Sequence, residues 1–242
     1  MKICVAQTRP IKGDIQSNIG NHKKLIDLAI FNGVDTVIFP ELSITGYEPE
    51  LSKELATNQN DSRFDDFQMI ADTKQITIGV GVPTKNDIGI CISMILFQPH
   101  KARQTYSKNY LHSDEEEFFI SGQNYTGLIG NKTNIALAIC YELSVPEHSE
   151  NAYKTGAKFY IASVAKSVSQ VDKAIKTLSD IAKKYSMTVL MSNCVGQSGG
   201  MECGGRTSIW NNKGLLVGEL DETNEGIIII DTDTQELIKK TI

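Results

Sequence analysis

Long apolar runs are missing from this sequence. No segment approaches the roughly 18 consecutive apolar residues that a transmembrane helix requires. The first residues, MKICVAQTRPIKGD, contain a short apolar stretch without the longer apolar region and cleavage site of a signal peptide. We therefore expect no membrane partner, and a cytoplasmic location is the default expectation.

Cysteine and histidine are scarce and irregularly spaced. The five cysteines, an odd number, include no CxxC pair, which fits a reduced compartment better than a disulfide framework. The four histidines include no HExxH motif, and the sequence has neither a GxxxxGK[ST] loop nor a GxGxxG loop after a strand. We therefore expect no metal site and no cofactor.

Charge of one sign does not predominate. Lys and Arg number 24 against 29 Asp and Glu, which gives a net charge of -5, and the two signs are interspersed along the chain. A protein that binds nucleic acid usually carries a basic patch or stripe, and this sequence has none. Nucleic acid is therefore not expected as a partner.

The 242 residues also lack a linker or low-complexity stretch. One domain over residues 1–242 is the simplest organisation, because this length supports a single large core. Short β-rich runs alternate with helical patterns, which predicts an α/β protein.

The expected helices cover residues 17–32 with Ser17 as N-cap, 50–58, 62–75, 146–155 and 168–186. The expected strands cover residues 2–7, 35–40, 76–83, 89–97, 134–140, 158–165, 187–196, 206–211, 214–220 and 226–233. The expected strands over residues 76–83 and 89–97 should pair antiparallel around a TKND turn.

Three short strand-like runs are each followed by a potentially reactive group. Glu41 follows VIFP, Lys108 follows QTYS, and Cys140 follows IALAI. Taken alone, each has an ordinary explanation: a solvated turn carboxylate, an edge charge and a small core residue. Groups at strand ends can also be held rigidly for chemistry, because the sheet fixes them in place.

The context of these residues resembles the nitrilase superfamily of carbon-nitrogen hydrolases. FPELSITGYEPE, YSKNYL and ICYELSVPE occur in the family's order, and VAQTRPIKGDIQSNI, FFISG, MSNCVG and GRTSIWNNKG extend the resemblance over essentially the whole chain. The resemblance implies a four-layer α-β-β-α sandwich, assembled as a homodimer or larger homo-oligomer. It also implies a small-molecule amide substrate.

Amide hydrolysis needs a nucleophile, a proton shuttle and positive charge near the carbonyl oxygen. We assign these roles to Cys140, Glu41 and Lys108, with the backbone N–H of Tyr141 completing the oxyanion site. The resemblance further implies a supporting glutamate near the lysine. In SDEEEFFISG the spacing favours Glu115, followed by Glu116, over the third glutamate of the run.

Two departures from the family pattern bear on the substrate. Many amidases of the family carry arginine where this sequence has Ser144, and histidine where it has Tyr110. Without that arginine, a simple ω-amidase activity on dicarboxylic monoamides is doubtful. A small aliphatic or amino-acid-derived amide, or a carbamoyl compound, is favoured over a nitrile. Nitrile hydrolysis, acyl transfer to another acceptor and a non-catalytic binding role stay open as alternatives.

The segment GQSGG, residues 196–200, matches the GxSxG elbow of serine hydrolases. That elbow requires a following helix and a later histidine, whereas here a glycine-rich segment and a strand follow and the last histidine is His148. We therefore expect a loop. The four other cysteines are expected to be structural, and the loop position of Cys203 leaves it open to exposure. Asn193 and Trp210 either line the pocket or pack in the core.

Overall fold

The computed structural model describes residues 1–123, 128–129 and 134–242. Its β-strands form two large sheets and one hairpin. Five α-helices are described: α1 (Ile15–Phe31), α2 (Ser52–Leu55), α3 (Asp65–Lys74), α4 (Pro146–Lys154) and α5 (Val168–Tyr185). Short 3-10 turns cover Pro49–Leu51, Ser62–Phe64 and Cys140–Ser144.

The first sheet has the spatial order β15-β14-β1-β2-β3-β4-β5. Its strands are β1 (Lys2–Gln7), β2 (Thr36–Ile38), β3 (Thr77–Lys85), β4 (Ile90–Phe97), β5 (Gln104–Ser107), β14 (Gly226–Asp231) and β15 (Leu237–Thr241). β1, β2 and β3 are parallel, whereas β3 and β4 pair antiparallel as the sequence predicts. The β2 exit, which carries Glu41, and the β5 exit, which carries Lys108, therefore belong to one sheet.

The second sheet has the order β13-β12-β9-β8-β7-β6. Its strands are β6 (Leu128–Ile129), β7 (Ile135–Ile139), β8 (Phe159–Ser163), β9 (Thr188–Ser192), β12 (Ser208–Trp210) and β13 (Leu216–Glu219). β7, β8 and β9 are parallel neighbours, so their carboxyl ends lie along one edge. Cys140 follows β7 directly at this edge.

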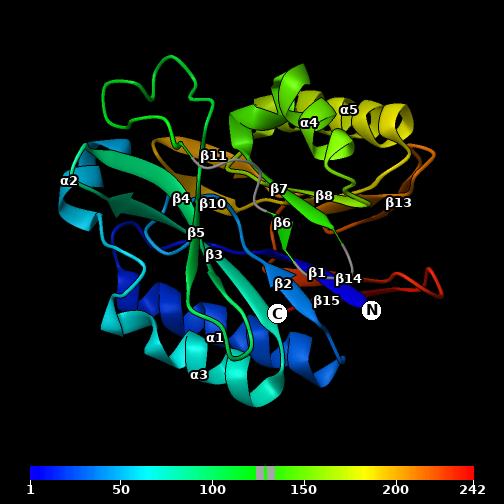
Figure 1. The fold of residues 1–242 in the computed structure, drawn as a ribbon, viewed down its shortest axis with the longest axis horizontal. Helices are drawn as coiled ribbons and strands as arrows, with labels where there is room; N and C mark the ends of the chain where they lie inside the picture. The colour runs from blue at the N-terminus through cyan, green and yellow to red at the C-terminus, as the bar shows by residue number, and fades with distance from the viewer. Residues whose placement is uncertain (124–127, 130–133) are drawn as a thin grey trace.

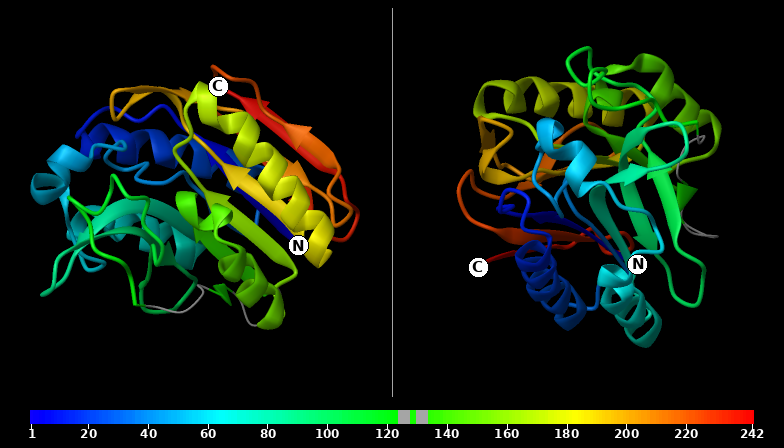
Figure 2. Two further views of the ribbon diagram at one scale, coloured as in Figure 1. Left: turned by 90° about the horizontal axis from the view of Figure 1, so that it is seen from above. Right: turned by 90° about the vertical axis from the view of Figure 1, so that its left-hand side faces the viewer.

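The two sheets pack face to face between two layers of helices, as the sequence resemblance implies. Figure 1 shows α1 and α3 covering the outer face of the first sheet, and α4 and α5 covering the outer face of the second. The right-hand view in Figure 2 shows the same layers from another side, whereas the left-hand view looks down onto α4 and α5. The protein is thus a four-layer α-β-β-α sandwich.

Side-chain alternation along β1 explains how the first sheet fills two cores. Successive residues of a strand point to opposite faces. Ile3 and Val5 join the core that includes the second sheet, whereas Cys4 and Ala6 join the core beneath α1 and α3. The strand is accordingly apolar throughout, as expected for a strand buried on both faces.

Helix α5 covers the second sheet with one apolar stripe. Its buried residues recur three and four apart, the spacing of one helical face, and they are Val171, Ala174, Leu178, Ile181, Ala182 and Tyr185.

Two serines at the carboxyl ends of β8 and β9 join the sheets by hydrogen bonds. Ser163 Oγ donates to the Phe39 carbonyl at 2.8 Å, and Ser192 Oγ donates to the Ala6 carbonyl at 2.6 Å. All of these groups are buried, so the bonds form without competition from water. These two bonds fix the relative position of the two sheets close to the strand ends.

Several local expectations need correction. Helix α1 is capped by Asp14, whose side chain accepts from the Ser17 N–H, so the assignment of Ser17 as N-cap was wrong. The glycine-rich segment around GQSGG forms a hairpin of β10 (Val195–Ser198) and β11 (Met201–Gly204). Within that hairpin Cys203 is only 1% exposed, because it packs against Cys194 and Ala165.

Close packing of Gly81 in β3 sets the path of the chain around Glu41. A Cβ added at Gly81 would lie 2.3 Å from the Pro40 carbonyl oxygen and 2.4 Å from the Leu42 nitrogen. Both are backbone atoms, so neither can move aside by a change of rotamer. The approach also lets the Ile44 N–H donate to the Gly81 carbonyl at 3.0 Å.

We expect Gly81→Ala to lower the free energy of unfolding by about 2 kcal/mol or more, since overpacking of a tight site typically costs this much. Gly20→Ala in α1 is the matched control: apart from the local backbone of the helix, no atom lies within 4 Å of its added Cβ. That change should raise stability by about 0.5–1 kcal/mol through helix propensity. Urea denaturation of both variants tests the pair, and equal effects would contradict the role given to Gly81.

Candidate active site

The three predicted residues occupy the ends of strands from both sheets. Glu41 lies beyond β2 and Lys108 directly beyond β5, whereas Cys140 begins the 3-10 turn after β7. All three are buried, and Cys140, at 8% exposure, is the most accessible. Because the sheets stack face to face, strand exits far apart in the sequence meet at one place.

A buried ion triad forms the inner part of the site. Lys108 Nζ donates to Glu41 Oε1 at 2.9 Å and to Glu115 Oε1 at 2.6 Å. Burial by itself would lower the Lys108 pKa, but the charges of Glu41, Cys140 and Glu115 outweigh it and raise that pKa. The lysine is therefore a fixed positive charge, and two of its three N–H donors are occupied by carboxylates.

Glu115 is the glutamate of the acidic run that enters the site. Its Oε1 also accepts from the Tyr47 hydroxyl at 2.9 Å, and its Oε2 accepts from the His112 N–H at 2.8 Å. Glu116, the second candidate, is exposed and contributes no hydrogen bond to this group. The geometry thus separates the two neighbouring glutamates, giving Glu115 the place beside Lys108.

Glu41 retains an unused acceptor. Its Oε2 is buried and has no hydrogen-bond partner among the described residues. Burial raises the Glu41 pKa and Glu115 raises it further, while Lys108 and the nearby thiol of Cys140 lower it. A carboxylate whose pKa is raised, with a free oxygen next to a thiol, is suited to accept a proton.

Cys140 has a backbone conformation that few residues adopt. Its φ is +44°, in the left-handed region that is unfavourable for residues with a Cβ. Burial, followed by the charge of Glu41, raises its thiol pKa to about 11, while Lys166 and Lys108 act in the opposite direction. At neutral pH the side chain is therefore a thiol, and it needs a base to become a nucleophile.

Glu142 fixes the strand end that carries the cysteine. Its Oε2 accepts from the Ile139 N–H at 2.7 Å and from the Tyr106 hydroxyl at 2.7 Å, and its Oε1 accepts from the Asn109 N–H at 2.6 Å. One buried carboxylate thus joins the residue before Cys140 to the residue after Lys108. No role in the site was predicted for Glu142 from the sequence.

A small cavity opens onto the thiol. Its volume is about 90 Å³. The candidate nucleophile and its neighbour Tyr141 line it, together with polar residues of the loop around Glu115 and residues of β11 and the β8–α5 connection. The lining residues are Tyr47, His112, Asp114, Glu115, Cys140, Tyr141, Ala165, Lys166, Gln170 and Met201. Lys166 was not singled out from the sequence.

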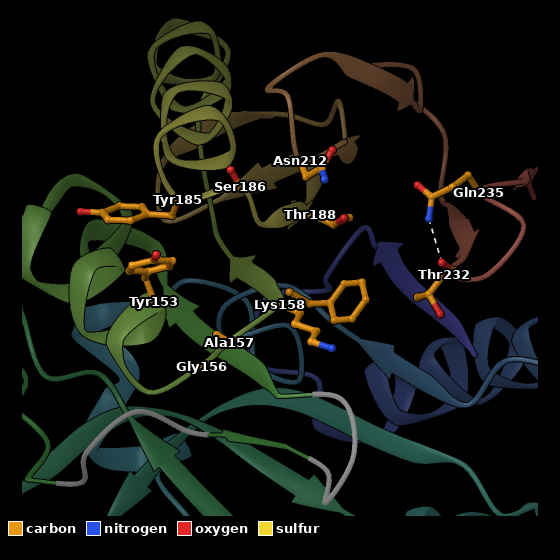
Figure 3. Close-up of a pocket in the computed structure, with 11 residues that line it drawn as sticks. Tyr153, Gly156, Ala157, Lys158, Tyr185, Ser186, Thr188, Asn212, Thr232 and Gln235 are labelled. Atoms are coloured by element: carbon orange, nitrogen blue, oxygen red, sulfur yellow. Dashed lines mark hydrogen bonds between the residues drawn. The ribbon is translucent and has the colours of Figure 1, made fainter.

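A larger hollow of about 400 Å³ adjoins this cavity and shares Tyr47 and Asp114 with it. Another, of about 490 Å³, lies at the amino ends of β8 and β9, the opposite end of these strands from Ser163 and Ser192. Figure 3 shows it between Tyr153 and Tyr185 on one side and Thr232 and Gln235 on the other. None of the predicted site residues lines it.

The structure also places Asn193 and Trp210, which the sequence assigned either to the pocket or to the core. Asn193 is fully buried and bonds the backbone of Lys166, so it supports the cavity wall without lining it. Trp210 is buried in the core between the second sheet and its helices. No cluster of metal-ligating side chains is found in the described part of the chain, and none of its helices is long and apolar enough to cross a bilayer.

Fold and site together define a class of enzyme: a four-layer α-β-β-α hydrolase with a cysteine presented at a strand end. The family model for carbon-nitrogen hydrolases matches residues 2–240, and the chain belongs to this family. As a class it is therefore a hydrolase of carbon-nitrogen bonds.

Individual relatives are more distant. The "Hydrolase in agr operon" of Staphylococcus aureus is 27% identical, over 98% of this chain and 93% of its own length. A glutamine-dependent NAD(+) synthetase of Acinetobacter baylyi is 24% identical over all of this chain, which spans only 46% of that protein. The amidase from Nesterenkonia sp. AN1, seen with acrylamide added to its active-site cysteine, shares the fold with a TM-score of 0.87 at 21% identity, over 97% of this chain and 94% of the amidase.

We expect Glu142→Ala to lower the free energy of unfolding by about 3 kcal/mol, because it removes the acceptor of three hydrogen bonds, including those from the buried Ile139 N–H and Tyr106 hydroxyl. Glu142→Gln keeps one oxygen acceptor and should cost distinctly less. Urea denaturation measures both changes. A Glu142→Ala protein as stable as the wild type would show that this carboxylate does not hold the two strand ends together.

Proposed function

We propose that the protein hydrolyses a small amide or carbamoyl compound through a thioester on Cys140, with Glu41 and Lys108 completing a catalytic triad. The observation that carries this proposal is the position of the Cys140 thiol, at a strained strand end beside a Glu41 carboxylate that Lys108 holds in place. The family membership and the likeness to cysteine-dependent amidases support it.

The first step is proton transfer and attack. Glu41 takes the thiol proton on its unpaired Oε2, and the sulfur forms a bond to the substrate's carbonyl carbon as the carbonyl π electrons move to oxygen. The raised pKa of Glu41 brings the carboxylate closer to the thiol in basicity, which lowers the cost of this transfer. No free thiolate has to accumulate.

The tetrahedral intermediate places negative charge on the former carbonyl oxygen. Lys108 has one N–H left after its bonds to Glu41 and Glu115, and the backbone N–H of Tyr141 follows the nucleophile directly. We assign both groups to this oxygen. Fixed donors in a buried site are effective here because they need no reorganisation as the charge develops.

Collapse of the intermediate breaks the C–N bond. Glu41 returns its proton to the leaving nitrogen, which departs as ammonia or an amine, and the acyl group stays on sulfur. Glu41 then deprotonates a water that attacks the thioester, and the released thiolate recovers the proton. Glu115 does not touch the substrate in this scheme; it positions Lys108.

Ammonia release across a panel of short aliphatic amides, amino-acid amides, ureido compounds and nitriles tests the proposal. We expect turnover of an amide or ureido class, a loss of at least about 10³-fold in Cys140→Ala, and a loss of at least about 10²-fold in Glu41→Gln, the range typical for removing a general base. Circular dichroism confirms folding. Activity that persists in Cys140→Ala would rule out the thioester.

Glu41→Gln should have opposite effects on hydrolysis and on thiol ionisation. The negative charge of Glu41 raises the thiol pKa, so its removal should lower that pKa from about 11. We expect faster labelling of Cys140 by a small neutral thiosulfonate at pH 8 in Glu41→Gln than in the wild type, with Cys140→Ser as the unlabelled control. Slower labelling would show that Glu41 assists loss of the thiol proton more than its charge opposes ionisation, and would contradict this expectation.

The same assays separate the alternatives. Product formation from nitriles alone would favour nitrile hydrolysis, and thioester formation that turns over only with an added amine or alcohol would favour acyl transfer. Binding without turnover would favour a non-catalytic role. Assembly as a homodimer or larger homo-oligomer and a cytoplasmic location remain predictions, of which the first is open to sedimentation analysis.

A further inference from the structure

Lys166 is a second lysine beside the candidate nucleophile, and it differs from Lys108 in its surroundings. It follows β8 of the second sheet and is partly exposed, whereas Lys108 belongs to the first sheet and is fully buried. Among the described residues that line the 90 Å³ cavity, Lys166 is the one lysine or arginine. It therefore faces the space that a substrate would occupy.

The backbone of Lys166 is held at both of its polar groups. Its N–H donates to Asn193 Oδ1 at 2.8 Å, and its carbonyl accepts from the Gly204 N–H at 2.8 Å. Asn193 is itself fixed, because its Nδ2 donates to the Gly205 carbonyl at 2.7 Å. Such support positions a binding group before the ligand arrives, which reduces the entropy lost on binding.

The ammonium of Lys166 has no carboxylate of its own. No ion pair joins it to an acidic side chain of the described residues, whereas Lys108 contacts two. The Lys166 pKa is raised mainly by the charge of Cys140, with which its side chain also forms a hydrogen bond, and less by Glu41. Withdrawing an ammonium from water is unfavourable unless a partner compensates. An anion in the cavity would be that partner.

We propose that Lys166 binds an anionic group of the substrate, and that the substrate is a short amide or carbamoyl compound whose carboxylate lies close to the reacting carbonyl. This proposal rests on the proposed function, since it takes Cys140 as the nucleophile. A lysine ammonium and a carboxylate form a charge-assisted hydrogen bond, which is stronger than a neutral one. The closeness of Lys166 to Cys140 and the small cavity both limit the length of the acyl chain.

This assignment changes the expectation drawn from Ser144. The sequence lacks the arginine that many family amidases carry there, and this absence argued against substrates with a second carboxylate. Lys166 supplies a cation from a different element, the connection between β8 and α5. The α5 N-terminus lies on the same side, since Gln170 in its first turn also lines the cavity.

Paired substrates test the proposal. Succinamate and butyramide differ by a terminal carboxylate in place of a methyl group, so their ratio of kcat/KM values reports recognition of the anion. We expect the wild type to prefer succinamate, Lys166→Gln to lower the ratio by about 10- to 100-fold, the effect of losing one charged hydrogen bond, and Lys166→Arg to retain part of it. An unchanged ratio in Lys166→Gln, with both constants reduced together, would overturn the proposal and make Lys166 a thiol-activating group.

Lys12→Gln is the matched control for overall charge. Lys12 lines the adjoining hollow, pairs with Glu48 at 3.1 Å and is not part of the small cavity. This change should leave the ratio within about twofold, since salt screens an exposed charge that lies outside the small cavity. A drop as large as that of Lys166→Gln would show a general field effect and would overturn a specific contact.

Binding separates this inference from the hydrolase proposal. Calorimetry with Cys140→Ala and with Cys140→Ala/Lys166→Gln measures succinamate affinity without turnover, and we expect at least a tenfold weaker Kd in the double variant. Lysine-dependent binding without any ammonia release by the wild type would sustain the anion site and refute hydrolysis of this substrate. If the wild type hydrolyses an amide but the two variants bind succinamate equally well, the hydrolase proposal stands and the anion site is refuted.

Discussion

The burial of Lys108 is the constraint on which the site depends. A fully buried ammonium costs several kcal/mol unless charged partners surround it, and here Glu41 and Glu115 both contact its Nζ. These partners come from the β2 exit and from the acidic loop, so the lysine can be accommodated only when both segments are in place. Ordering of the loops and assembly of these buried charges are therefore one event.

A second buried carboxylate, that of Glu142, links these segments of the first sheet to the second sheet. Glu142 binds the Asn109 N–H beside Lys108 and the Ile139 N–H beside Cys140. It therefore ties the lysine of the first sheet to the cysteine of the second, while Ser163 and Ser192 fix the sheets at the same edge. Under the proposed mechanism, proton transfer over a short distance requires this alignment.

The sequence predicted the elements well and the irregular segments less well. Strand and helix patterns located β1, the β3–β4 pair, α4 and α5, because these depend on local periodicity. The choice between Glu115 and Glu116 needed the turn of the loop, which spacing alone does not define. Lys166 was not predicted as a site residue, because the sequence does not distinguish a single lysine after a strand from a solvated surface charge. Its orientation depends on Asn193, which lies 27 residues later in the chain.

Placement of the candidate nucleophile on one sheet and its base on the other has an evolutionary consequence. The apolar layer between the sheets, which includes Val5 and Ile38 from one side and Leu137 and Ile161 from the other, sets the spacing of Cys140 and Glu41. Under the proposed mechanism, a substitution in this layer is subject to selection for catalysis as well as for stability. Drift in the core should be slower here than in the layer beneath α1 and α3, where a change of packing leaves the reacting groups where they are.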